Sequence, residues 1–264
     1  MRGRGRATPA TAEPALEVVY GHRACLAVLA KRPDAIVEAL VSPASRREAE
    51  PLLRALRGRV RELPDAQLAR VAGTGHHEGV VLRTTPRKWA SGKELRALLD
   101  PKRPEAARRV AIALDRVRNP YNIGATLRSA AFFGIDAAVL GAPAPHPALP
   151  PDAARVAEGG AEHLVLSRTT DLAETLARLR EHGVFVYGAE NDGALDVMGL
   201  AFHRPCVLVF GHEREGISER VRAQCHAMVA IRGTGAIDSL NVSIAASLLI
   251  AELVRSSGPS TGQR

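Results

Sequence analysis

The sequence has few aromatic residues, few cysteines and no long apolar run. Phe, Trp and Tyr make up 3% of its 264 residues, so Ala, Leu, Val and Ile must build the core. Its three cysteines, Cys25, Cys206 and Cys225, lack metal or redox spacing, and we expect buried small side chains in a reducing compartment. No stretch approaches the roughly 20 apolar residues of a membrane span, and no apolar segment follows the basic start as in a secretory signal. We therefore expect a soluble cytoplasmic protein.

Several common catalytic signatures are also missing. The sequence contains no G-x-x-x-x-G-K-[ST] loop, no G-x-G-x-x-G opening a helix after the first C-terminal strand, no G-x-S-x-G elbow and no H-E-x-x-H pair. The nine histidines do not cluster at the spacing of metal ligands. These absences argue against a conventional kinase, dehydrogenase, hydrolase or metalloenzyme, and we expect no bound metal.

The positive charge is confined to one part of the chain. Residues 1–107 contain 20 Lys and Arg against 12 Asp and Glu, whereas residues 108–264 contain 16 of each. The net charge of +8 therefore belongs entirely to the N-terminal part. A local basic excess is typical of a surface that faces a polyanion, because cationic side chains release counterions from phosphates. The alternative is a solvated surface that only keeps the protein in solution.

Hydrophobic patterning divides the chain into five segments. Residues 1–16 lack any apolar period and are expected to form a disordered basic arm. Residues 17–84 alternate between predicted helices (21–31, 46–56, and 65–71 with Asp65 as N-cap) and predicted strands (35–41, 60–63, 79–82). Residues 85–107 contain three prolines and one short helical pattern at 94–99, which indicates a linker. Residues 108–256 form a second domain, and residues 257–264 a flexible tail.

The second domain has the pattern of an α/β fold. Short apolar strands are predicted at 110–114, 137–140, 164–166, 184–187 and 207–210. Helices are predicted between and after them at 123–133, 151–157, 172–179 and 240–254. Strands that alternate with helices in this way indicate a parallel sheet covered on both faces.

Three unusual loops follow strands of this sheet, at the edge where α/β proteins bind ligands. They are residues 115–128 (DRVRNPYNIGATLR), 210–218 (FGHEREGIS) and 231–245 (IRGTGAIDSLNVSIA). Each loop also has an ordinary structural explanation. Asn122 is a candidate N-cap, Arg128 a candidate surface residue, and Asp238 or Ser239 a candidate N-cap of the last helix.

Taken together, the three loops resemble the three motifs of the SpoU branch of the SPOUT methyltransferases. Asn122–Arg128 resembles the first motif, Gly211–Ile217 the second, and Ser239–Ala245 the third, in the same order. Residues 18–82 are similar to the L30e-like substrate-binding domain that precedes many SpoU catalytic domains. The sequence departs from the third motif at Arg232, which follows Ile231 where the family commonly has proline.

The resemblance implies a deep trefoil knot in the C-terminal domain, S-adenosylmethionine as cofactor and a homodimer. The implied activity is transfer of a methyl group to a ribose 2′-hydroxyl of rRNA or tRNA. The family's catalytic arginine corresponds to Arg128, whose role stays open between a base and a clamp on the ribose and phosphate, since arginine is normally cationic. The implied catalytic set is Arg128, Asn122, Glu213, Ser239 and Asn241, and the implied cofactor-binding set is Gly211, Gly216, Ile231, Leu240 and Asn241.

Two rival functions remain open. The first is a non-catalytic RNA-binding or assembly protein that has kept the knotted scaffold, which Arg232 and the basic N-terminal part favour. The second is methylation of a base or of a protein, against which the SLN-type third motif argues. The candidate catalytic side chains are all present, which favours the enzyme.

Overall fold

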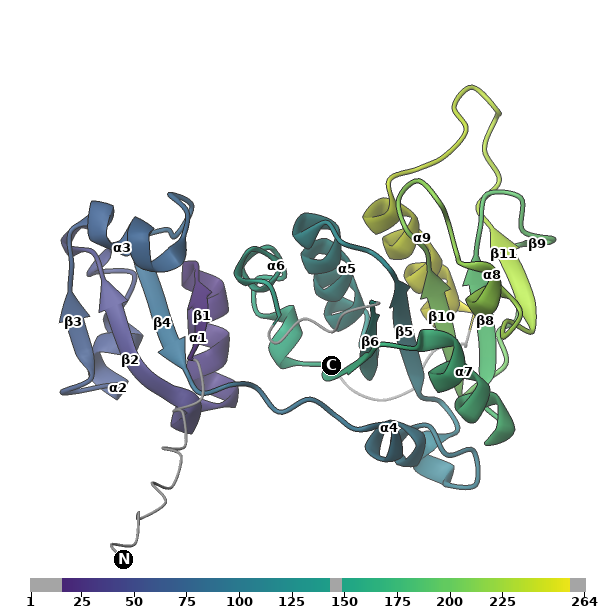
Figure 1. Cartoon of the computed structure of the whole chain (residues 1–264), viewed down its shortest axis with the longest axis horizontal. Coiled ribbons are helices and arrows are strands. Elements are labelled where there is room, and N and C mark those ends of the chain that lie inside the picture. Colours follow the sequence, from purple (N-terminus) through teal and green to yellow (C-terminus); the bar gives the residue numbers. More distant parts are fainter. Residues whose placement is uncertain (1–15, 143–148, 257–264) are drawn as a thin grey trace, which may run out of the picture.

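The chain forms two β-sheets joined by a short helical segment (Figure 1). The structure is a computed structural model that describes residues 16–142 and 149–256. The predicted basic arm, apart from Leu16, and the predicted tail at 257–264 lie outside the described residues.

Residues 17–84, here called the N-terminal region, form a mixed four-stranded sheet in the order β1-β4-β2-β3. Strand β4 pairs antiparallel with both β1 and β2, while β2 and β3 are parallel. The predicted alternation of helices and strands is confirmed, with β1 as an additional strand. The elements are β1 (Glu17–Tyr20), α1 (His22–Lys31), β2 (Ile36–Val41), α2 (Glu50–Ala55), β3 (Val60–Glu62), α3 (Asp65–Ala72) and β4 (Val80–Thr84).

Two helix starts in this region differ from the predictions. Helix α3 has Pro64 at its N-cap position, and Asp65 is its first residue. The Asp65 carboxylate therefore faces the positive end of the helix dipole instead of capping an amide. Helix α2 begins at Glu50 because the chain first forms a 3-10 turn at Pro43–Ser45, where the Ser42 hydroxyl accepts a hydrogen bond from the Ser45 amide.

The C-terminal region, residues 108–256, contains a seven-stranded sheet in the order β7-β6-β5-β10-β8-β11-β9. All its strand pairs are parallel, as predicted. The predicted strands are present, and two short ones, β9 and β11, were not predicted. The strands are β5 (Val110–Asp115), β6 (Ala137–Gly141), β7 (Val165–Thr169), β8 (Phe185–Ala189), β9 (Leu195–Asp196), β10 (Cys206–Phe210) and β11 (Ala227–Ala230). The helices are α5 (Pro120–Phe132), α6 (Pro151–Val156), α7 (Leu172–Glu181), α8 (Glu219–Arg222) and α9 (Val242–Arg255).

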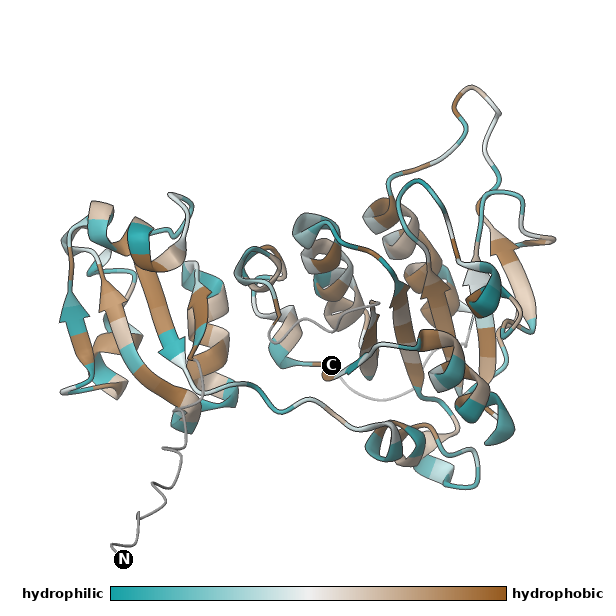
Figure 2. Ribbon diagram, in the orientation of Figure 1, coloured by the Kyte–Doolittle hydropathy of each residue, from teal (hydrophilic) through white to brown (hydrophobic). Residues whose placement is uncertain are grey.

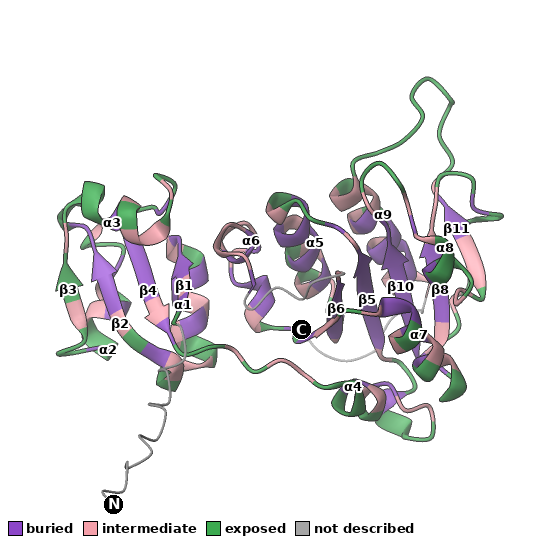
Figure 3. Cartoon of the chain, in the orientation of Figure 1, coloured by how far each residue is buried: buried purple, intermediate pink, exposed green. Residues whose placement is uncertain are grey.

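Strand residues alternate between two apolar cores on opposite faces of this sheet. In β10, Leu208 and Phe210 pack with α5 and α9, whereas Val207 and Val209 pack with α7 and α8. Because both faces are covered, the central strands are apolar throughout and buried (Figures 2 and 3). The two-sided α/β architecture is therefore confirmed, and the trefoil knot stays a prediction.

The segment 85–107, predicted to be a linker, contains helix α4 (Gly92–Leu98). Ser91 and Glu94 form a capping box at its start, and Leu95 and Leu99 are buried in the core beneath α7. Just before the helix, Trp89 packs against the other core, with the Arg168 guanidinium 4.9 Å from its ring centre. Residues 89–99 are therefore packed on the C-terminal region.

The N-terminal region is fastened to the C-terminal region by buried charges. Glu162, in the 3-10 turn after α6, accepts hydrogen bonds from Arg32 Nε (3.0 Å) and Arg87 Nη2 (2.8 Å). The Glu162 and Arg87 side chains are both only 7% exposed. Nearby, the Tyr20 hydroxyl of β1 donates to the Asp152 carboxylate of α6. The two sheets are therefore held together at α6 and the turn that follows it.

We predict that Glu162→Gln destabilises the protein by about 1–3 kcal/mol, because the Arg32 and Arg87 guanidinium groups lose one of their two carboxylate partners and keep only Glu17, at 3.7 and 3.9 Å. The matched control is Glu174→Gln, which breaks the exposed Glu174–Arg178 pair and should cost less than about 1 kcal/mol. Urea unfolding followed by circular dichroism measures both. Equal effects of the two substitutions would show that the buried cluster adds nothing.

Candidate functional site

The loops that follow β5 and β10 meet because these two strands are neighbours in the sheet. The buried Asp115 carboxylate, at the end of β5, accepts a hydrogen bond of 2.7 Å from the Ser218 amide. Arg116 donates to the Gly216 carbonyl at 3.3 Å and pairs with Glu215. The first and second sequence motifs are thus joined at the carboxyl edge of the sheet.

A polar cluster connects all three motifs. Asn122, buried in the first turn of α5, donates from Nδ2 to Glu213 Oε1 at 2.8 Å. Asn241 Nδ2 donates in turn to Asn122 Oδ1 at 3.2 Å. These residues are 91 and 119 positions apart in sequence, so only the folded sheet brings them together. The cluster presents one carboxylate and two amides, whose donors and acceptors can orient a polar substrate.

The candidate N-caps of the two helices at this site are corrected by the structure. Asn119 caps α5 by accepting from the Tyr121 amide, which leaves Asn122 free to bond across the site. Asn241, and neither Asp238 nor Ser239, caps α9 by accepting from the Ser243 amide at 2.9 Å. Asn241 therefore uses its oxygen to begin the helix and its nitrogen to bind Asn122.

The second motif closes into a tight loop that requires glycine at two positions. The amides and carbonyls of His212 and Gly216 bond to each other at 3.0 and 2.9 Å. A Cβ on Gly211 would lie 2.2 Å from the Gly216 carbonyl carbon, and Gly216 itself has a φ of +66°. The loop therefore carries Glu213 at its tip in a fixed place beside Asn122.

The third motif begins in an open loop after β11. Ile231 packs against the core, while Ser239 and Leu240 are exposed. Within the described residues, the amides of residues 232–240 form no hydrogen bond to another backbone group. Arg232, in the position where the family commonly has proline, donates to the Gly193 carbonyl at 2.6 Å. Arg232 thus fastens one end of the loop and leaves its backbone groups available to a ligand.

Arg128 lies two turns along α5 from Asn122 and forms no hydrogen bond to the polar cluster within the described part of the chain. Its Nη2 lies 3.0 Å from Glu158 Oε2, and the side chain is 53% exposed. The structure therefore groups Asn122, Glu213 and Asn241, and it places Arg128 on a neighbouring surface of α5.

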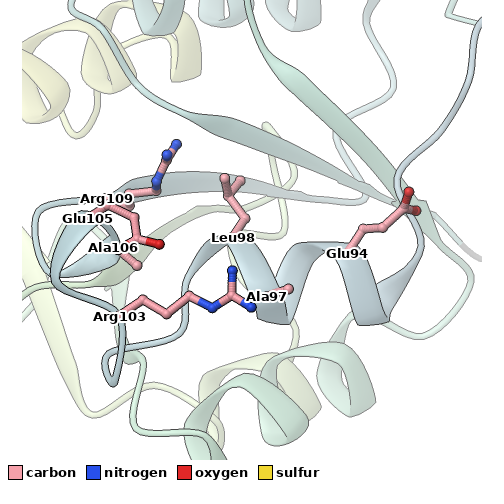
Figure 4. Close-up of a pocket in the computed structure, with 7 residues that line it drawn as sticks. All are labelled: Glu94, Ala97, Leu98, Arg103, Glu105, Ala106 and Arg109. Atoms are coloured by element: carbon pink, nitrogen blue, oxygen red, sulfur yellow. The ribbon is translucent and has the colours of Figure 1, made fainter.

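Two cavities lie away from the polar cluster. One, of about 240 Å³, lies between α4 and the start of β5, and Figure 4 shows Glu94, Arg103 and Arg109 among the residues that line it. This is the amino edge of the sheet. The other, of about 580 Å³, lies at the carboxyl edge, and its lining includes Glu215 and Ile217 of the second motif but not Glu213.

Burial disfavours the thiolate form of the three cysteines, which is the nucleophilic form. Burial raises the pKa of the Cys206 and Cys225 thiols to about 12, so both stay protonated near neutral pH.

In residues 16–142 and 149–256, no group of three His, Cys, Asp or Glu side chains is placed to hold a metal ion. Over the same residues, no helix is long and apolar enough to cross a membrane.

Sequence reasoning missed three residues that shape this site. Asp115 and Arg116 join the loops that follow β5 and β10. The sequence feature that could have identified them is their position at the end of an apolar strand. Glu158 binds Arg128 from a turn that carried no recognisable motif for that role. An ion pair between residues 30 positions apart has no local sequence pattern.

These features define an α/β protein with a polar site at the carboxyl edge of a parallel sheet. Residues 109–251 match the SpoU rRNA methylase family, and residues 18–90 match an RNA 2′-O-ribose methyltransferase substrate-binding domain. The chain therefore belongs to the SpoU family. It is an RNA ribose 2′-O-methyltransferase that uses S-adenosylmethionine.

Similar proteins extend over most of the chain. A 23S rRNA (guanosine-2′-O-)-methyltransferase RlmB from Yersinia pestis is 32% identical over 92% of this chain and 98% of its own length. A putative TrmH family tRNA/rRNA methyltransferase from Staphylococcus haemolyticus is 31% identical over 74% of this chain and 77% of its own. The fold is similar to that of the SpoU methyltransferase AviRb from Streptomyces viridochromogenes, with a TM-score of 0.75 and 22% identity over 92% of this chain and 91% of that one.

We predict that Asn122→Ala loosens the second and third motifs, since it removes the bonds to Glu213 and Asn241. Each lost bond is worth about 1 kcal/mol, so amide hydrogen exchange in residues 211–218 should become roughly fivefold faster. Exchange followed by mass spectrometry measures this. Asn191→Ala, at an exposed loop position, serves as the control, and unchanged exchange in Asn122→Ala would contradict the predicted role of the cluster.

Proposed function

We propose that the chain methylates a ribose 2′-hydroxyl of the large-subunit ribosomal RNA in the cytoplasm, with the site centred on Asn122, Glu213 and Asn241. The observation that carries this proposal is the hydrogen-bonded connection of the three motifs. The choice of ribosomal RNA is supported by the rRNA methylase family match and by the likeness to RlmB over nearly the whole chain.

The loop chemistry fits an adenosyl ligand. S-adenosylmethionine, when bound, supplies an electrophilic methyl group. Apart from the Ala236 amide, which donates to Thr234 Oγ1, the backbone amides of residues 232–240 are suited to the polar edges of an adenine and a ribose. Exposed apolar side chains at Ile237 and Leu240 are suited to the face of the base. We assign the cofactor-binding role to Gly211, Gly216, Ile231, Leu240 and Asn241.

Arg128 is proposed to act on the RNA. A guanidinium is cationic at neutral pH and offers five N–H donors, so it can hold a phosphate and stabilise negative charge that develops on the ribose oxygen. We therefore propose that Arg128 holds the phosphate and ribose of the RNA and is not the base. Asn122, Asn241 and Ser239 are proposed to orient the hydroxyl by hydrogen bonds, and Glu213 to fix Asn122.

We also propose that two copies of the chain form a homodimer through α5 and α9. The hydroxyls of Ser129 and Ser247 lie 2.7 Å apart, so these helices are in contact. Around this contact, Phe132 is 82% exposed and Ile244 and Leu248 are about half exposed. A second copy would cover this apolar surface, and Arg128 lies one turn from Phe132 on the same helix.

The N-terminal region is proposed to be the RNA-holding domain and residues 108–256 the catalytic domain. The match of residues 18–90 to a substrate-binding domain supports this division, as does the basic excess of residues 1–107. Arg46, Arg47, Arg57 and Arg61 are exposed around α2 and β3, where they can contact phosphates.

Arg128→Ala should retain binding of S-adenosylmethionine, within about twofold by calorimetry, and reduce methylation by at least about 100-fold. The assay combines purified protein, methyl-labelled cofactor and total RNA from cells that lack the gene. A 2′-O-methyl group blocks alkaline cleavage of the adjacent phosphodiester, so resistant sites map the product. Lack of cofactor binding by the wild-type chain would favour a non-catalytic RNA-binding protein, and sites outside 23S rRNA would contradict the proposed substrate.

Leu248→Glu should convert the dimer to a monomer, because the substitution places a charge in the apolar contact. Analytical ultracentrifugation measures the mass. Met198→Glu is the control, since Met198 is 67% exposed in the loop after β9. A wild-type chain that sediments as a monomer would refute the dimer.

A further inference from the structure

A carboxylate outside the three motifs connects Arg128 to the N-terminal region. Glu158 Oε2 lies 3.0 Å from Arg128 Nη2 on α5 and 2.6 Å from Arg23 Nη1 on α1. A single oxygen atom therefore binds two cations that belong to different halves of the molecule. The Glu158 side chain is 33% exposed, whereas Arg23 is 71% exposed, so the Arg128 contact is the better shielded of the two.

The backbone around Glu158 is fixed independently of these ion pairs. Glu158 has a φ of +46° and Gly159 a φ of +90°, so the turn after α6 adopts a conformation that few side chains tolerate. A Cβ on Gly159 would lie 2.5 Å from Ala27 Cβ of α1, and a Cβ on Gly160 would lie 3.0 Å from Arg128 Cα of α5. The turn therefore packs closely against both α1 and α5.

We propose that Glu158 is a positioning residue for Arg128, and that docking of α1 through Arg23 sets the place of Glu158. The inference rests on the proposed role of Arg128 in methylation. Its consequence is that the RNA-holding domain, when docked, also orders the arginine that acts on the ribose.

The chemistry of the guanidinium explains why such a contact is useful. Arg128 is half exposed on a helix surface, where a long side chain samples many rotamers. Glu158 holds one Nη nitrogen, which leaves the other donors directed away from the carboxylate and available to a ribose oxygen and a phosphate. Misplacement of a catalytic group by a fraction of an ångström to 1 Å costs roughly 10- to 100-fold in rate.

The test compares Glu158→Gln with Glu78→Gln. Glu78 also has a positive φ, of +54°, and also joins the two halves of the molecule, through Arg155 at 3.7 Å. Unlike Glu158, it does not bind Arg128. Glu158→Gln should lower kcat about tenfold, with unchanged Kd for S-adenosylmethionine, and Glu78→Gln should leave kcat within about twofold. Glu158→Asp, which keeps the charge and suits a positive φ, should recover part of the loss.

A second readout does not require turnover. Phenylglyoxal modifies free guanidinium groups, so mass spectrometry of modified peptides reports how firmly Arg128 is held. Its modification should be several-fold faster in Glu158→Gln than in the wild type and unchanged in Glu78→Gln. If Arg128 reacts equally fast in all three proteins, Glu158 does not hold it.

A double variant tests the connection to the N-terminal region. Arg23→Ala should lower kcat by about two- to threefold, and Arg23→Ala/Glu158→Gln should match Glu158→Gln alone, because both act through one contact. An unchanged or raised kcat in Glu158→Gln overturns the positioning role, and additive losses in the double variant overturn the link through Arg23. Absence of methylation by the wild-type protein would instead be a failure of the proposed function, and the phenylglyoxal comparison would still decide the contact.

Discussion

The site depends on one geometrical constraint, which is that the strands of the large sheet are parallel. Every strand of such a sheet ends at the same edge, so the loops after β5, β10 and β11 emerge together. Strands β5 and β10 are also direct neighbours. Asn122 and Glu213 therefore come within 2.8 Å although 91 positions separate them. The three motifs lie together because backbone pairing brings them to one edge of the sheet.

A second constraint is the burial of charge between the two sheets. Glu162 and Glu17 form a shielded cluster with Arg32 and Arg87. Buried ion pairs contribute little net stability, and in some proteins their directional bonds help to select one arrangement. Glu158 lies in the same turn and binds both α1 and α5. The short segment from Glu158 to Glu162 therefore contacts both the N-terminal region and Arg128.

Most of the helices and strands could be predicted from the local pattern of apolar residues. Apolar runs of strand length at 110–114 and 207–210 indicated buried parallel strands, and both are present as β5 and β10. The four-residue β11 and two-residue β9 were missed because they are too short to show a period and exist only through pairing with longer strands. The sequence suggested Asn122 and either Asp238 or Ser239 as caps of α5 and α9, whereas the structure uses Asn119 and Asn241.

The sequence alone determined the α/β class, the alternation that buries both faces of the sheet, and the residues of the three motifs, since each depends on local periodicity or local turn chemistry. The tertiary structure alone decided which of those residues touch. In the folded protein Asn122 contacts Glu213 and Asn241, and Arg128 lies beside Glu158. Asp115 and Arg116 bind the loop that contains the second motif. The physical reason is that contacts between distant residues follow from the order of strands in the sheet and from the packing of α1, α5 and α6. Neither the strand order nor this helix packing produces a periodic pattern of apolar residues in the sequence.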